Sequence, residues 1–423
     1  MLGRLLPGVA ALLLFPHALQ SQTGSPAATL PAGFPLRIAL DHRYPIRTGT
    51  QVEGRLTSAL YLVDHIVLPV DTPVYGVVTG RHPVKRGLRI NAMLDGDFTP
   101  LAEPEVQFDR LQLPDGSQLE FSATAVKRNA VVVHMSTAAP DNSPKGRVKT
   151  EWNVRRRDFL HQYASPGRGE RLRQVVYRMM PYHPQNLWTG DQFDAELARP
   201  LAIPQPEDTA AALPLAELSG TKPPTGTIEA RLTEDLTSAK SPVGMPVEAV
   251  LSKPLFDQKH EHLLLPEGTI LTGSVVESHP AGMFGKNGQL RFSFRKIEMA
   301  ENSIPTHGVV VGAEGAKGAN IAIDSEGGTR ATTPNRALGT LTLAVLAAAS
   351  QGDDGGNLLN SAVVSNGFGM MGRFVSMALA DKNVASGFAY YALAKNVYRR
   401  WIARGKDVSF PRNTRVEIDL AAR

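Results

Sequence analysis

The chain contains no cysteine among its 423 residues. It therefore cannot form a disulfide, hold a metal through thiolates or carry the lipid-modified cysteine of a lipoprotein. The patterns H-E-x-x-H, G-x-S-x-G and the P-loop, which would indicate a zinc protease, an α/β-hydrolase or a nucleotide site, are also missing. The formal net charge of +5 is too small on this length to indicate nucleic acid as a partner. We expect no enzyme activity, no catalytic residue, no cofactor and no metal.

Long hydrophobic runs are also rare, and the one at the N-terminus is short. Residues 1–22 are predicted to be a signal peptide, because Arg4 provides the positive start and residues 5–15 form an apolar stretch of the right length. An uncleaved anchor is the alternative, although crossing a bilayer takes about 20 apolar residues. Residues 23–33 are rich in small residues and proline and are predicted to be a disordered leader. We therefore expect an exported protein, periplasmic or associated with the outer membrane.

A block of sequence occurs twice without a gap, at residues 64–83 and 261–280. A self-match at constant offset indicates a repeated architecture. Each copy reads as an apolar strand, a turn with proline, a second strand with a glycine, and a His-Pro end. We therefore predict two copies of one β-rich module. Among the identical pairs are His65 and His262, Leu68 and Leu265, Pro69 and Pro266, Gly76 and Gly273, and Pro83 and Pro280.

A second pattern, an apolar residue, an acidic residue and a leucine three positions later, recurs along the chain. On a strand this alternation directs the apolar side chains to one face and the acid to the other. We interpret the acids as a solvated outer face, and carboxylates that line a channel are the alternative. The copies lie at residues 52–56, 193–197, 228–232, 247–251 and 416–420.

Each module interrupts its β-pattern with a helical insertion, basic at about 148–182 and apolar with much glycine and alanine at about 337–404. One last strand follows each insertion, and it must pair with an edge that the earlier strands leave open. A barrel or a two-layer sandwich satisfies this requirement. We predict a mainly β fold with α insertions, in two tandem barrel or sandwich modules at 34–203 and 225–423. The segment 204–224, rich in proline, alanine and threonine, is predicted to be a linker.

Three local motifs have both a functional and a structural interpretation. The glycines of residues 367–372 fit G-x-G-x-x-G but lack the βαβ context of a dinucleotide site, so we interpret them as helix packing. His260 and His262 would share one face of a strand, but no third metal ligand is indicated. The arginines within 155–178 fit a solvated helix face, and contact with lipid phosphate or an acidic partner is the alternative.

The end of the 337–404 insertion combines aromatic and cationic residues. Such a mixture is typical of a membrane interface, and cations also suit a helix C-terminus. The alternative is that the aromatic side chains dock the helix on the barrel. We therefore predict a contact site for membrane or partner, made of Phe388, Tyr391, Tyr398, Arg399, Arg400 and Trp401.

Residues 263–273, 288–294 and 410–420, with a helical insertion before the last of them, resemble the TrbI-like family. Its members are the β-barrel core components of type IV secretion and conjugation channels. In that family the barrel domain lies in the periplasm, assembles as a ring and projects a helical pair towards the outer membrane. The resemblance implies that role for residues 337–404, in a duplicated and divergent member.

From this resemblance we expect a non-enzymatic scaffold of the cell envelope, or a component similar to a secretion channel, that acts by self-association or by binding protein partners. The alternative is a periplasmic ligand-binding module or a hydrolase that uses a cleft between the two modules.

Overall fold

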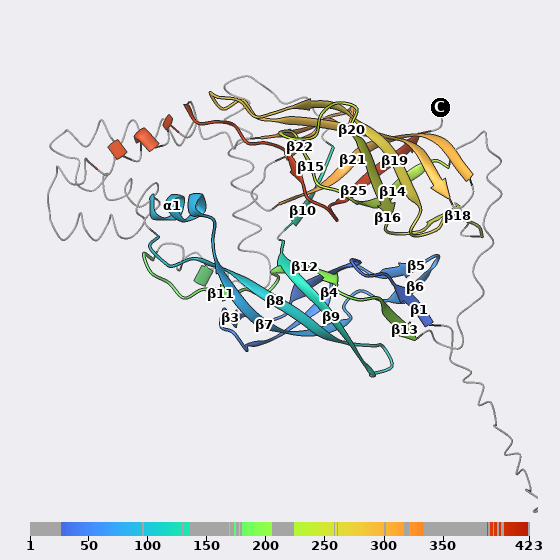
Figure 1. The fold of residues 1–423 in the computed structure, drawn as a ribbon, viewed down its shortest axis with the longest axis horizontal. Helices are drawn as coiled ribbons and strands as arrows, with labels where there is room; N and C mark the ends of the chain where they lie inside the picture. The colour runs from blue at the N-terminus through green and yellow to red at the C-terminus, as the bar shows by residue number, and fades with distance from the viewer. Residues whose placement is uncertain are drawn as a thin grey trace, which may run out of the picture.

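The computed structural model describes residues 27–94, 97–128, 130–135, 180–204, 224–257, 259, 261–299, 302–316, 321–332 and 402–421, with single positions within 169–177 and 387–398. These residues form a mainly β protein with two closed six-stranded barrels (Figure 1). The predicted fold class is therefore confirmed. Nearly all of both predicted insertions, and most of the predicted linker, lie outside the described residues.

The first barrel closes in the order β12-β2-β4-β7-β8-β9, with every neighbouring pair antiparallel. Alternation builds its core, since Leu36, Ile38 and Leu40 on one strand all point inward and are almost fully buried. A closed sheet leaves no edge strand for unwanted pairing. The strands are β2 (Pro35–Leu40), β4 (Gln51–Leu56), β7 (Pro73–Pro83), β8 (Ala102–Gln112), β9 (Gln118–Lys127) and β12 (Gln192–Leu197).

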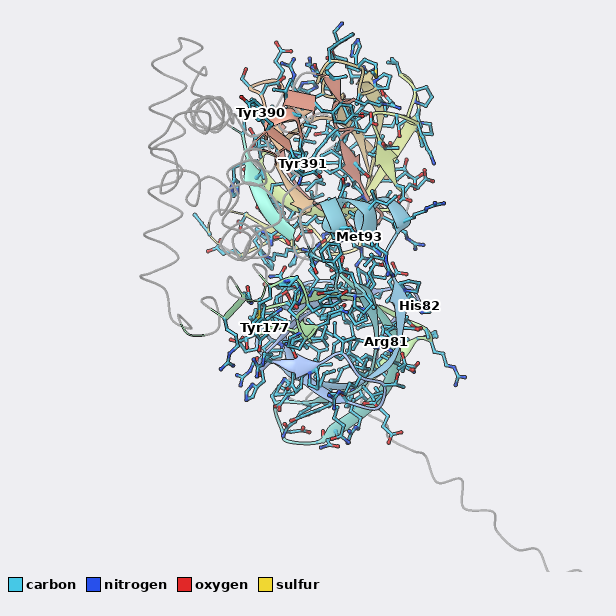
Figure 2. The ribbon with its side chains drawn as sticks, turned by 90° about the vertical axis from the view of Figure 1, so that its left-hand side faces the viewer. Arg81, His82, Met93, Tyr177, Tyr390 and Tyr391 are labelled. Carbon is cyan, nitrogen blue, oxygen red and sulfur yellow. The ribbon has the colours of Figure 1, made fainter. Side chains whose placement is uncertain are left out.

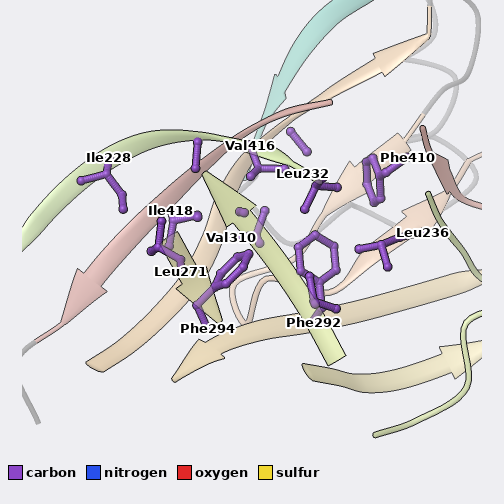
Figure 3. Packing of buried hydrophobic residues seen from close by; sticks show 14 of the residues in the cluster. Ile228, Leu232, Leu236, Leu271, Phe292, Phe294, Val310, Phe410, Val416 and Ile418 are labelled. Atoms are coloured by element: carbon purple, nitrogen blue, oxygen red, sulfur yellow. The ribbon is translucent and has the colours of Figure 1, made fainter. Parts of the chain in front are cut away.

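The second barrel has the same chain order around its circumference, β14-β16-β19-β20-β21-β25, and closes through the pairing of β20 with β21. Its core is centred on three phenylalanines (Figure 3). The ring centroid of Phe292 lies 6.0 Å from that of Phe294 and 6.0 Å from that of Phe410, and both ring pairs are in edge-to-face contact. Its strands are β14 (Gly226–Leu232), β16 (Pro246–Leu251), β19 (Ile270–His279), β20 (Gln289–Met299), β21 (Asn302–Ala316) and β25 (Arg415–Ala421).

Short strand pairs decorate both barrels. One of them corrects a prediction: the leader at 23–33 is not wholly disordered, because β1 (Ala27–Leu30) pairs along its length with β13 (Leu201–Pro204) and buries Leu30. The other pairs are β3 (Tyr44–Pro45) with β11 (Asn186–Leu187), β5 (Leu60–Leu62) with β6 (His65–Leu68), β15 (Leu236–Thr237) with β24 (Ser409–Phe410), β17 (Leu255–Phe256) with β18 (Leu263–Leu265), and β22 (Ile321–Ile323) with β23 (Thr329–Ala331).

Gly76 and Gly273 occupy equivalent places on β7 and β19, and each lies at a bulge where the neighbouring strand comes close. A Cβ on Gly76 would lie 2.4 Å from the backbone oxygen of Gln107. A Cβ on Gly273 would lie 1.9 Å from that of Ser293. Close approach of two backbones therefore requires glycine at both positions of the repeated sequence block.

Strand β10 (Ala130–His134) crosses from the first barrel to the second. Only residues 128–129 separate it from β9, yet it pairs antiparallel with residues 312–316 of β21. The prediction that all of residues 34–203 belong to the first module is therefore wrong for this strand. The 15-residue strand β21 extends beyond the β20 pairing, and β10 covers the edge that this extension would leave open.

Candidate interaction site

The two barrels are joined by hydrogen bonds between little-exposed side chains. Arg37 on β2 donates two hydrogen bonds, of 2.9 and 2.7 Å, to the carboxylate of Glu314 on β21. It donates a third, of 3.1 Å, to the backbone oxygen of Asn413, whose side chain donates to Glu196 at 2.6 Å. A two-point guanidinium–carboxylate contact fixes direction as well as distance. The side chains of Arg37 and Glu314 are only 18% and 9% exposed, so losing one partner leaves the other charge poorly hydrated.

The acids of the recurring pattern contribute to the same interface. Asp194 forms an ion pair of 2.8 Å with Arg128 and lies 3.9 Å from Arg37. Burial raises the pKa of Asp194, and the two arginines oppose that rise. Glu229 and Glu417 in the second barrel are likewise only 14% and 19% exposed. The interpretation of these three acids as a solvated face is wrong, because their side chains are little exposed and form ion pairs.

A titratable carboxyl lies in the turn between β18 and β19, against the first barrel. The backbone N–H of Glu267 donates to the backbone oxygen of Val63 at 2.9 Å. The charged group that faces the Glu267 carboxyl is Arg231. The guanidinium of Arg231 also lies 4.4 Å from the ring centroid of Phe34 in the first barrel. Burial raises the pKa of Glu267 to about 7, and Arg231 opposes this rise. Burial also lowers the pKa of Arg231.

A hollow of about 370 Å³ lies on the second barrel and is lined by Glu229, Lys253 and Glu417 among others. The space between the barrels that adjoins it amounts to about 50 Å³, well below the roughly 300 Å³ at which ligand pockets begin. Among the described residues no cluster of three or more histidine, aspartate or glutamate side chains is placed to hold a metal ion. The charged residues that line this space are Arg37, Glu229, Arg231, Lys253 and Arg415.

At one end of the second barrel, the loop at residues 281–288 packs against the segment 403–407, where the helical insertion ends. The carboxylate of Asp407 accepts hydrogen bonds from the backbone of Ala281 at 2.7 Å and from the hydroxyl of Ser238 at 3.0 Å. Three backbone hydrogen bonds of 2.9 Å then join the two segments: Gly285 to Ala403, Gly405 to Gly282, and Gly288 to Lys406. These hydrogen bonds hold the loop against residues 403–407.

The predicted contact site at the end of the insertion is only partly described. Tyr391 is half-buried, with the ammonium of Lys395 5.9 Å from its ring centroid, and Tyr398 is 58% exposed. Figure 2 shows Tyr390 and Tyr391 on the side of the molecule that faces the viewer. The other predicted members, Phe388, Arg399, Arg400 and Trp401, lie outside the described residues. The contact site therefore stays a prediction.

The first barrel braces the equivalent loop in a similar way. The ring of Phe98 lies 6.2 Å from that of Tyr182. The backbone N–H of His183 donates to the hydroxyl of Thr99 at 3.1 Å, and its imidazole lies 3.3 Å from the carboxylate of Asp97. This loop contains α1 (Arg86–Leu94), a helix that the sequence patterns did not indicate.

The remaining motifs receive little structural description. The glycines of 367–372 and His260 lie outside the described residues, as does most of the basic segment 155–178, in which Arg173 is exposed. His262 is exposed, and its backbone N–H donates to Asp257. Within the described parts of the chain, no helix is both long and apolar enough to cross a membrane.

Comparison with solved structures finds distant similarity. No family model and no curated protein matches the chain. Among solved structures, the chain is similar to ComB10 of the Com type IV secretion system of Helicobacter pylori, with 8% identity and a TM-score of 0.24 over 43% of this chain and 93% of that one. Membership of the TrbI-like family therefore stays a prediction.

Proposed function

We propose that the protein is a non-enzymatic scaffold of the cell envelope, similar to a secretion-channel component, which acts by binding protein partners or further copies of itself. One observation carries this proposal: strand β10 pairs with β21 of the second barrel, and Arg37 of the first barrel donates to Glu314 of the second, so the two barrels are joined. A joined double barrel suits a part that must keep its shape inside an assembly. A ligand-binding protein that closes on its substrate needs a hinge and a larger cavity.

The proposed location is the periplasm or the outer membrane, and the proposed contact is with that membrane or with a neighbouring subunit. The predicted signal peptide supports export, and the resemblance to the TrbI-like family supports a place in the periplasm or at the outer membrane. The insertion at 337–404, with its predicted aromatic and cationic end, is proposed as the part that contacts the outer membrane or a neighbouring subunit.

The test is a mass measurement of the native complex after fractionation of the cell envelope. We expect the protein in the envelope fraction, in a complex several times its 45.6 kDa chain mass. Mutating Arg37 to Glu should weaken the joint between the barrels and reduce the yield of that complex, whereas the variant that also carries Glu314→Arg should restore it. A soluble monomer with no associated protein would refute the proposal.

A further inference from the structure

Phe284, at the tip of the 281–288 loop, combines high exposure with an unusual backbone conformation. Its side chain is 74% exposed, and the neighbouring Met283 is 56% exposed. The backbone of Phe284 has a φ of 60°, in the left-handed region that aromatic residues rarely adopt. The bonds to residues 403–407 hold this turn in place. An exposed aromatic side chain that is kept at a conformational cost is an observation that calls for a functional hypothesis.

The equivalent loop of the first barrel exposes apolar side chains as well. Leu88, Ile90 and Met93 of α1 are 54%, 47% and 41% exposed. Of residues 86–93, Ala92 is half-buried and the others are exposed, so α1 packs on the barrel only weakly. A nine-residue helix is marginal in water by itself. A surface that covers its apolar side chains would stabilise it.

Positive charge accompanies both loops. Within the described residues no ion pair engages the exposed side chains of five cations: Lys85, Arg86 and Arg89 at α1, and Lys286 and Lys406 at the other loop. Acidic side chains lie on the adjoining strands, where Glu105 contacts His82 at 2.9 Å and Glu277 contacts His279 at 3.3 Å. In Figure 1, α1 and the red chain around residues 402–408, to which the 281–288 loop is bonded, lie on the same side of the molecule.

We infer that these two loops bind the surface of an anionic phospholipid bilayer. The loops have different shapes, a helix and a tight turn, and share only exposed apolar side chains bordered by cations. These shared features fit a planar, negatively charged membrane surface. The cations of the loops attract the lipid headgroups, and the apolar side chains at the loop tips enter the boundary between headgroups and acyl chains. A protein partner would need a separate pocket for each loop. The inference concerns residues outside the 337–404 insertion and does not depend on the scaffold function.

The experiment measures co-sedimentation of the whole chain with vesicles of phosphatidylglycerol and phosphatidylcholine, and with vesicles of phosphatidylcholine alone. The two loop variants are Met283→Ser with Phe284→Asn, and Leu88→Gln with Ile90→Gln. Asparagine tolerates the left-handed conformation, and glutamine keeps helix propensity, so neither variant is expected to unfold the protein. The matched control is Ile66→Gln, a residue that is 55% exposed and belongs to β6, a strand at the opposite end of the molecule from α1 in Figure 1.

We expect binding to the anionic vesicles only, weakened by salt. Each loop variant should lower the partition coefficient about tenfold or more, and Lys286→Glu should lower it about fivefold or more. The control should bind like the unchanged chain. Failure of the unchanged chain to bind anionic vesicles would overturn the inference. So would equal binding by both loop variants, which would locate the contact elsewhere, for example in the 337–404 insertion.

Discussion

Changing Glu267 to glutamine tests whether the contact between the barrels depends on pH. In the folded protein, burial raises the pKa of this carboxyl from 4.5 to about 7. The folded state therefore holds the proton more tightly than the unfolded chain does. The resulting stabilisation is fully present below pH 4.5 and is lost as the pH rises through 7.

The size of this effect follows from the two pKa values. Their difference of about 2.5 corresponds to about 3 kcal/mol, at 1.36 kcal/mol for each pKa unit. The carboxyl keeps some contact with solvent, and screening reduces the value to between about 1 and 3 kcal/mol. Glutamine has no proton to release and keeps the backbone hydrogen bond to Val63, so this contribution should no longer vary with pH.

The assay is urea unfolding of the unchanged chain and of Glu267→Gln at about pH 5 and about pH 8. Relative to the unchanged chain, the free energy of unfolding of the glutamine variant should be about 1–3 kcal/mol higher at pH 8 than at pH 5. Glu234→Gln, which alters an exposed carboxylate of the same barrel, is the control for general charge effects. If the glutamine variant at position 267 follows the same pH profile as the unchanged chain, this carboxyl does not control the interface.

Three further changes test other contacts. Arg37→Ala should cost about 3–5 kcal/mol in urea unfolding, because it leaves Glu314 little exposed and without its two-point partner; replacing both residues by methionine should cost much less, and equal losses would contradict this account. Gly273→Ala should cost about 3 kcal/mol or more because of the backbone oxygen 1.9 Å from its Cβ, whereas Gly87→Ala in α1, with no atom within 4 Å of its Cβ, should cost nothing measurable. Phe284→Asn should raise the melting temperature, by an amount equivalent to about 1 kcal/mol, since asparagine relieves the left-handed strain; a lower melting temperature would show that the phenyl ring supports the fold.

The barrels could be predicted from sequence because they depend on local alternation and on a repeated turn. Leu36, Ile38 and Leu40 alternate with less buried residues, and Gly76 and Gly273 recur at the places where two backbones meet. The strand order is the same in both barrels, as a repeated pattern implies.

The interface could not be predicted in the same way. Alternation indicates that Arg37 and Asp194 point out of a barrel, but not what lies opposite them. The partner Glu314 is distant in sequence and belongs to no recurring motif. Strand β10 was missed for a related reason, since its partner β21 is supplied by the other barrel.

The candidate contact residues were found where aromatic and cationic residues cluster in sequence, as at Tyr391 and Tyr398. Phe284 was missed because it is a single aromatic residue in a glycine-rich loop. The glycines at 282 and 285 were an available signal, because they indicate a tight turn that leaves a side chain at its tip exposed.

The crossing of β10 imposes an order on folding. During synthesis the N-terminal part of the chain emerges first, and the first barrel can close once β12 has been made. Strand β10 cannot pair until β21 has been made, nearly half the chain length later. Until then, five residues with a free backbone edge are open to pairing with other chains. Docking of this strand is therefore a late step, and the interval before it is when the nascent protein is most exposed to misassembly.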